Sequence, residues 1–150
     1  MMVRISAAAA LALCLAVPVF ADDKKNEADL KAMVGNWKVE KAELGGKDLT
    51  EFLKVLKFEI QDGGKYIAEH GKEKDEGSFT VDASKNPKEM DIKSTGGPNK
   101  GKNIKAIYKQ DGDTITICYE LGSDKGARPE KFESKADTML LLVTYKREKK

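Results

Sequence analysis

The chain has 150 residues, of which 27 are lysine or arginine and 25 are aspartate or glutamate, and its formal net charge at pH 7 is +2. Positive and negative side chains are interspersed along the sequence. This balance argues against nucleic acid as a partner, because proteins that bind nucleic acid concentrate positive charge on one face. The length suits one domain whose core is stable without disulfides.

The first 21 residues are typical of a secretory signal peptide. Arg4 supplies a positive charge, residues 5–20 are uncharged and mostly apolar, and Val19-Phe20-Ala21 forms the cleavage site. The apolar stretch is shorter than the roughly 20 residues that span a bilayer, and no second such stretch follows, so we expect no transmembrane segment. We expect cleavage near Ala21 and export of the mature protein to the periplasm or the exterior.

The sequence contains two cysteines, Cys14 and Cys118. A lipid anchor on Cys14 is a less favoured alternative to signal cleavage, because Leu13 before it is not small. Without Cys14, Cys118 has no intramolecular partner and must be buried, free or paired between chains. Strand alternation places Cys118 on an outward face, which predicts that its thiol is alkylated in the folded protein.

Alternation of apolar and polar residues dominates the mature chain. Residues 22–28 are charged and are expected to form a linker, and residues 29–150 are expected to form one β-domain that begins with a short helical turn. Eight alternating runs, separated by turns rich in glycine, aspartate and proline, are typical of half-buried strands. These runs cover residues 36–43, 55–61, 65–70, 77–82, 89–94, 103–110, 113–120 and 138–147.

Two turns predict the register of neighbouring strands. The Asp111-Gly112 pair indicates a two-residue hairpin with Tyr108 opposite Ile115. For the turn after the second strand, a three-residue loop that places Phe58 opposite Ala68 is preferred to a two-residue loop. Short antiparallel connections fit a closed up-and-down barrel or a two-sheet sandwich, and we favour the barrel because closure removes exposed edges.

A short helix is expected between the first and second strands. Residues 48–54 place Leu49, Phe52 and Leu53 at helical spacing, with Asp48 as the N-cap. This helix would lie across one end of the barrel. A plug that completes the core is favoured over a moving lid.

The aromatic side chains that alternation turns inward are the candidate ligand-binding residues. Aromatic walls with a few hydroxyl groups suit small apolar molecules, although the same residues also suit a solid core. Met139 is assigned to the same inward face. The aromatic candidates are Trp37, Phe58, Tyr66, Phe79, Tyr108, Tyr119 and Tyr145.

Candidates for catalysis are scarce. His70 is the only histidine, and the sequence places no nucleophile beside it. One histidine and one mature cysteine argue against a metal site. Residues 96–103 fit part of a phosphate-binding loop, but Asn103 stands where serine or threonine is needed, and a strand pattern follows instead of a helix. We therefore expect no enzyme activity, metal or cofactor.

Several short motifs occur in order from about Leu30 to the C-terminus. With them the chain resembles the uncharacterised lipocalin-like domain family expanded in planctomycete-type bacteria. The resemblance implies a lipocalin-like barrel and export, but no activity. In better-known lipocalins an arginine on the last strand packs over the first-strand tryptophan, and the resemblance implies that Gly35, Trp37 and Arg147 form this closure. The motifs are Gly35-Asn36-Trp37-Lys38-Val39, Gly45-Gly46-Lys47, Gly97-Pro98-Asn99-Lys100-Gly101-Lys102, Tyr108 with Asp111-Gly112-Asp113-Thr114, Ile117-Cys118-Tyr119, Arg128-Pro129 with Phe132, and Lys146-Arg147-Glu148-Lys149.

Two functions follow from this reading. The first is an exported lipocalin-like domain that binds a small hydrophobic ligand in the barrel. The alternative is a filled barrel that acts as a protein-interaction or structural module of the cell envelope, with an envelope protein as its partner. The same inward aromatic residues serve both functions.

Overall fold

A computed structural model describes residues 20–123 and 126–149. Residues 1–19, most of the expected signal peptide, lie outside the described residues. Within the described part of the chain, no helix combines the length and the apolar character needed to cross a membrane. The elements are α1 (Phe20–Met33), β1 (Gly35–Leu44), β2 (Lys47–Asp48), α2 (Thr50–Leu53), β3 (Lys57–Gln61), β4 (Lys65–His70), β5 (Glu73–Asp82), β6 (Lys88–Gly96), β7 (Asn103–Asp111), β8 (Thr114–Glu120) and β9 (Leu140–Arg147).

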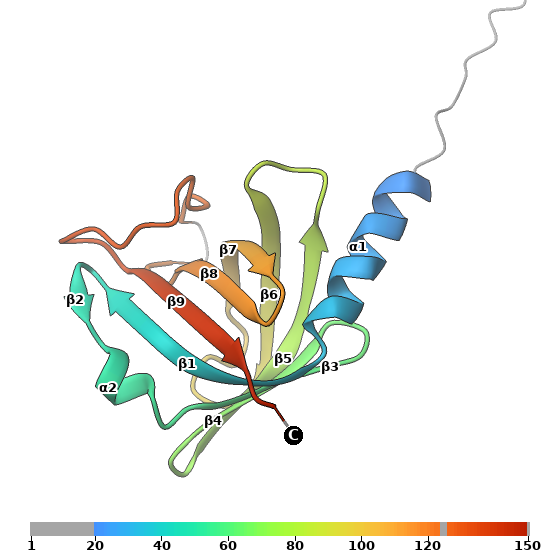
Figure 1. Ribbon diagram of the computed structural model, residues 1–150. Coiled ribbons are helices and arrows are strands. Elements are labelled where there is room, and N and C mark those ends of the chain that lie inside the picture. Colours follow the sequence, from blue (N-terminus) through green and yellow to red (C-terminus); the bar gives the residue numbers. More distant parts are fainter. Residues whose placement is uncertain (1–19, 124–125, 150) are drawn as a thin grey trace, which may run out of the picture.

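Eight antiparallel strands close into a barrel (Figure 1). From β3 to β9 each strand pairs with the next one along the chain, and β1 pairs with both β3 and β9. The short strand β2 pairs only with the end of β1. Because β9 returns to β1, the eight long strands form a closed ring instead of a two-sheet sandwich, and the predicted barrel is confirmed.

The β7–β8 hairpin differs from the prediction by two residues. Tyr108 lies opposite Ile117 and not Ile115, because the turn is formed by Gly112 and Asp113. Gly112 has a φ of +58° at the first central position, which is where type II′ hairpin turns favour glycine. A shift of two residues leaves every side chain on its predicted face, since strand side chains alternate with a period of two.

The β3–β4 hairpin has the predicted three-residue loop, with Phe58 opposite Ala68. Most residues assigned to the interior are also inside. Met139 is the exception: β9 begins only at Leu140, and Met139 lies before it with 48% of its surface exposed. The residues assigned inward that are buried are Trp37, Val39, Ile60, Tyr66, Phe79, Val81, Met90, Ile92, Tyr108, Ile115, Ile117, Val143 and Tyr145, and those partly buried are Leu56, Phe58, Ile104, Tyr119 and Leu141.

The N-terminal helix is longer than the sequence pattern predicts. Residues 22–28, expected to be a linker, belong to α1, which begins at Phe20. The helix contains three lysines and three alanines, which favour helix, and Glu27 pairs with Lys31 one turn later at 3.0 Å. The absence of an apolar stripe hid the helix from a reading based on hydrophobic periodicity.

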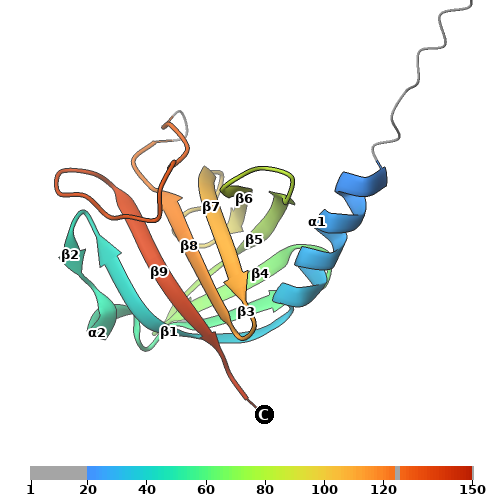
Figure 2. The ribbon, with the colours of Figure 1, turned by 45° about the horizontal axis from the view of Figure 1, so that its top comes forward.

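Helix α1 packs at the barrel end that carries the β3–β4, β5–β6 and β7–β8 turns (Figures 1 and 2). Met33 is fully buried, and Leu30 packs against the core beside the β3–β4 turn. The side chain of Asn26 accepts a hydrogen bond from the backbone N–H of Ala83 at 2.8 Å. The helix therefore covers this end of the barrel.

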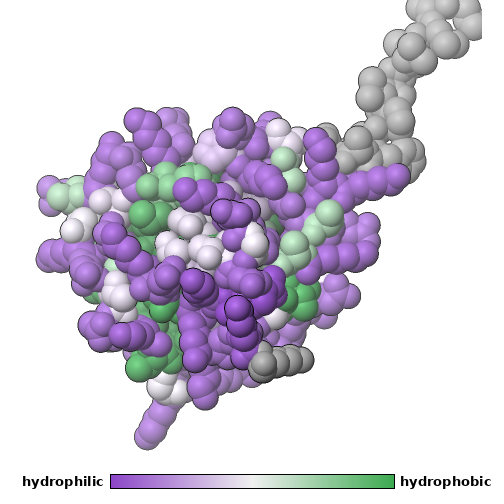
Figure 3. Space-filling view, viewed as in Figure 1, coloured by the Kyte–Doolittle hydropathy of each residue, from purple (hydrophilic) through white to green (hydrophobic). Residues whose placement is uncertain are grey.

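At the opposite end, α2 lies beside β1. Leu49 and Leu53 pack against the core, as a plug would. The helix begins one residue later than predicted, with Leu49 in the N-cap position. Asp48 does not cap the helix; its carboxylate accepts a hydrogen bond from the N–H of Thr50 at 2.8 Å. On the face shown in Figure 3, the outer surface is mostly hydrophilic.

The connection between β8 and β9 covers part of the outer face of the barrel. Ile107 and Cys118, which lie opposite each other on β7 and β8, are almost completely buried. The Sγ of Cys118 donates a hydrogen bond to the carbonyl of Glu133 in this connection at 3.5 Å. The prediction of an accessible Cys118 thiol is therefore wrong, because strand alternation cannot reveal a loop that folds back over the outer face.

Cys118 should resist alkylation in the folded protein. Reaction requires an exposed thiolate, and burial both blocks access and raises the pKa of the Cys118 thiol. We expect iodoacetamide to label the Cys118 peptide on the order of a hundredfold more slowly in buffer than in urea, because labelling must wait for local opening. Peptide mass spectrometry measures both rates. Equal rates in the two solvents would contradict the observed burial.

Candidate functional site

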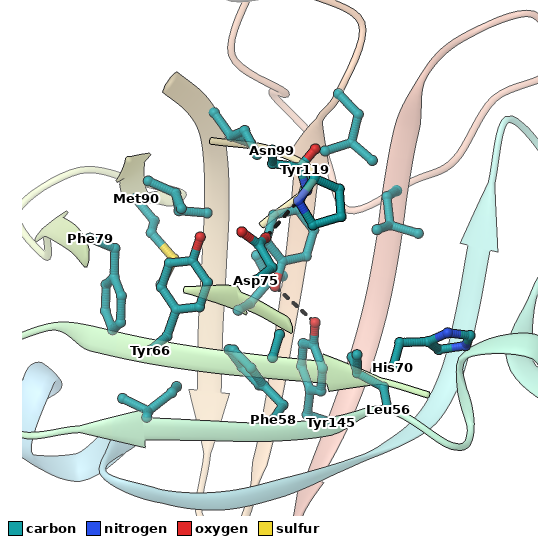
Figure 4. A pocket seen from close by; sticks show the side chains of 18 of the residues that line it. Leu56, Phe58, Tyr66, His70, Asp75, Phe79, Met90, Asn99, Tyr119 and Tyr145 are labelled. Atoms are coloured by element: carbon teal, nitrogen blue, oxygen red, sulfur yellow. Dashed lines mark hydrogen bonds between the residues drawn. The ribbon is translucent and has the colours of Figure 1, made fainter. Parts of the chain in front are cut away.

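A cavity of about 290 Å³ lies inside the barrel, toward the end that carries α2 (Figure 4). Its volume is at the lower limit for small-molecule pockets. Most of its wall is apolar. The aromatic wall residues are Phe58, Tyr66, Phe79, Tyr119 and Tyr145, and the aliphatic ones are Leu56, Ile60, Ala68, Met90, Ile92, Pro98, Ile104, Ile117, Leu121 and Leu141.

Phe58 of β3 is at the centre of the aromatic part of the wall. Its ring centroid lies 4.8 Å from that of Tyr145 on β9 and 6.3 Å from that of Tyr66 on β4. These separations are within the range in which tilted aromatic rings attract each other. Side chains from β3, β4 and β9 therefore form an aromatic wall before any ligand binds.

The hydroxyl groups of Tyr119 and Tyr145 meet at 2.9 Å (Figure 4). Burial raises the pKa of Tyr145 to about 12 and that of Tyr119 well above its ordinary value, so both phenols are protonated at neutral pH. One hydroxyl donates to the other, and the accepting one keeps its own proton. The structure gives this pair no other hydrogen bond among the described residues. The pair can therefore donate to a hydrogen-bond acceptor in the cavity.

Asp75 of β5 is held in the cavity wall by two donors. One carboxylate oxygen accepts from the Ser94 hydroxyl at 2.6 Å and the other from the Asn99 amide at 3.2 Å. Ser94 is 1% exposed, so this contact is shielded from solvent. Burial and then the nearby Asp75 charge raise the pKa of Tyr66 to about 12. The carboxylate is thus fixed beside the aromatic wall.

The β6–β7 loop brings Asn99 to the cavity. Gly97 has a φ of +90°, and a Cβ there would lie 2.1 Å from the carbonyl oxygen of Lys74. Only glycine permits this close approach between the loop and β5. The N–H of Gly101 closes the loop on the carbonyl of Ser94 at 2.9 Å. This glycine-rich segment, which partly fits a phosphate-binding motif, is therefore a strand connection at the cavity.

His70 lies at the rim of the cavity. Its Nε2 is 2.9 Å from the carbonyl oxygen of Phe52, and the two rings are 4.6 Å apart. In Figure 4 the imidazole points away from the labelled tyrosines. Neither of these contacts is to a hydroxyl or thiol nucleophile. The geometry of His70 therefore fits attachment of α2 to β4.

Trp37 and Tyr108, also predicted to bind ligand, do not line the cavity. The Trp37 Nε1–H donates to the carbonyl of Met33 at 2.9 Å. The Tyr108 hydroxyl donates to Asp29 of α1 at 2.7 Å, and Lys88 contacts the same carboxylate oxygen at 2.8 Å. Alternation identified these side chains as inward but could not tell which end of the barrel they occupy.

Gly35, Trp37 and Arg147 meet where α1 joins the barrel. The Arg147 guanidinium lies over the Trp37 ring, 4.4 Å from its centroid, and donates hydrogen bonds to the carbonyls of Ala32 and Val34. Gly35 has a φ of +145°, and a Cβ there would lie 2.6 Å from Arg147 Nη1. The glycine therefore leaves space for the guanidinium, and the three residues form a structural closure.

Asp75, Ser94 and Asn99 are the site residues that the sequence analysis missed. Asp75 lies between the predicted runs 65–70 and 77–82, in what the pattern treats as a turn, whereas β5 begins at Glu73. The signal was present: Asp75 has the same parity as Phe79, which was assigned inward. A carboxylate at an apolar parity position marks the site, but only the fold shows that Ser94 and Asn99 reach it.

Comparisons with known proteins give no match: no family model, no curated protein and no solved structure matches this chain. In the described part of the chain, no group of three or more histidine, cysteine, aspartate or glutamate residues is placed to hold a metal ion. The candidate site is thus defined by the geometry of the cavity.

Proposed function

We propose that this chain is an exported, lipocalin-like protein that binds a small, mainly apolar molecule inside its barrel. The cavity of about 290 Å³, with its preformed aromatic wall, is the observation that carries the proposal. An eight-strand barrel can be packed solid or hold one ligand. Here α1, Trp37 and Tyr108 fill one end, while the cavity lies toward the other. Export rests on the signal-peptide pattern of residues 1–21.

The cavity size limits the ligand. At about 30 Å³ per water-sized group, 290 Å³ holds on the order of ten non-hydrogen atoms. This is the size of a medium-chain alcohol or a single substituted aromatic ring, and it is too small for a complete lipid tail. The Tyr119–Tyr145 hydroxyl pair, which can both donate and accept, favours a ligand with one polar group.

The alternative role as an envelope interaction module has weaker support. It predicts a large apolar patch on the outside of the barrel. In the ranges that the structure describes, the exposed large apolar side chains are Val34, Phe52, Val55 and Met139. They are few: Phe52 and Val55 lie in α2 and the turn that follows it, whereas Val34 and Met139 belong to two other segments.

Filling the cavity should abolish binding. Ala68 lies in the wall between Phe58 and Asp75 on the neighbouring strands, so Ala68→Phe places a ring in the space that a ligand would occupy. With 1-octanol as the probe, we expect a dissociation constant on the order of 10–100 μM for the native protein. The variant should bind at least about tenfold more weakly, because the ring displaces the ligand. Titration calorimetry measures both dissociation constants. Fluorescence is less suitable, because Trp37 does not line the cavity and is a poor reporter of ligand binding.

Ile67→Phe is the matched control. Ile67 is the neighbour of Ala68 on β4 but does not line the cavity, so the same added ring should leave octanol binding unchanged. Circular dichroism establishes that both variants are folded. If native protein shows no heat of octanol binding, or if both phenylalanine variants bind it equally well, the proposed function is wrong.

A further inference from the structure

The cavity wall has acidic side chains that are not matched by lysine or arginine. Glu73 and Asp75 are both acidic, and the wall contains no lysine or arginine within the described ranges. The nearest basic residues along the β6–β7 loop, Lys100 and Lys102, are exposed and do not line the cavity. A ligand in this space therefore meets two carboxylates that no lysine or arginine of the described cavity wall balances.

Asp75 retains capacity for a further partner. Each carboxylate oxygen has two acceptor sites, and the Ser94 and Asn99 hydrogen bonds occupy one site on each. These two donors also fix the orientation of the carboxylate, so that little ordering is needed when a ligand arrives. An ammonium group, with its three N–H donors, can bind to the acceptor sites that remain free on the Asp75 carboxylate.

The aromatic wall also favours a positively charged ligand. Tyr66 lies close enough to Asp75 for the carboxylate to raise the pKa of its phenol, and Phe58 lies beside Tyr66. The faces of such rings attract cations, most strongly where water is excluded. A carboxylate ligand would instead be repelled by Asp75 across a space with mostly apolar walls.

We infer that the cavity selects cationic over anionic amphiphiles: the Asp75 carboxylate receives an ammonium head group, and the aromatic wall receives the apolar body. This inference rests on the proposed binding function and specifies its ligand class. The ligand is a primary amine of about ten non-hydrogen atoms, the number that the cavity volume allows.

Three ligands with the same chain test the inference: octylamine, 1-octanol and octanoate, titrated into the folded protein by calorimetry at neutral pH and low salt. We expect octylamine to bind at least about tenfold more tightly than octanoate, with octanol between them. Added salt should reduce the difference, because it screens the charge. If octanoate binds as tightly as octylamine or more tightly, the inference is wrong and the proposed function stands. If none of the three binds, the proposed function fails.

Asp75→Asn identifies the responsible carboxylate. It should lower the preference for octylamine over octanoate at least severalfold, because it removes the negative charge from the cavity wall. Asp111→Asn, which changes an exposed carboxylate outside the cavity wall, is the control and should leave this preference unchanged. An unchanged preference in Asp75→Asn would overturn the assignment. Should that variant not fold, Glu73→Gln, which removes the second wall charge, is expected to reduce the same ratio.

Discussion

Replacing Trp37 with alanine is expected to lower the free energy of unfolding by about 3–5 kcal/mol. Trp37 is 1% exposed and packs between the strands and the end of α1. The substitution leaves a large void, removes the hydrogen bond to the Met33 carbonyl and removes the ring that lies under Arg147. Urea denaturation followed by circular dichroism measures the loss, because the variant has no tryptophan fluorescence.

Two variants separate the contributions. Trp37→Phe keeps an aromatic ring under Arg147 but loses the indole N–H, so its cost should be intermediate. Phe52→Ala removes a ring that is 63% exposed and should cost less than about 1 kcal/mol. If Trp37→Ala were no more destabilising than Phe52→Ala, the closure around Trp37 would not contribute to stability as the contacts indicate.

The fold was largely predictable because a barrel repeats one simple pattern. Each strand has one dry face, so alternation identified all eight long strands and nearly all of the interior. It missed features that do not obey a period of two. Helix α1 has charged residues between Asp22 and Lys31 and no apolar stripe, so hydrophobic periodicity did not reveal it. The burial of Cys118 depends on a tertiary contact with the connection that follows β8, which a local pattern does not contain.

The candidate site was predictable only in part, for a related reason. The alternation of side chains along each strand identified the aromatic residues that face inward, but it did not show where along the barrel axis each one lies. Tyr108 and Tyr119 lie on neighbouring strands and both face the interior of the barrel. Tyr108 nevertheless binds α1, whereas Tyr119 lines the cavity. The polar side of the site was missed because Asp75 lies in a strand extension that resembles a charged turn. The position of the terminal helix decides which inward residues remain available to a ligand.

Replacing Arg147 with alanine is expected to lower the free energy of unfolding by about 2–3 kcal/mol. The guanidinium stacks on Trp37 and donates to the carbonyls of Ala32 and Val34 at the C-terminal end of α1, while its Nε contacts Asp113 at 3.0 Å. A cation here also opposes the negative end of the helix dipole. Its loss leaves carbonyl groups and an aromatic face without their partner. Trp37 fluorescence during urea denaturation measures the change.

The matched controls keep the position and change one property. Lys146→Ala removes an exposed neighbouring cation and should cost less than about 0.5 kcal/mol. Arg147→Lys keeps the charge but lacks the planar group that reaches two carbonyls and stacks on the ring, so it should recover only part of the stability. Full recovery by lysine would show that charge alone fastens α1 to the barrel. Octanol binding in Arg147→Lys should match that of the native protein, because the cavity and this closure lie toward opposite ends of the barrel and share no wall residue.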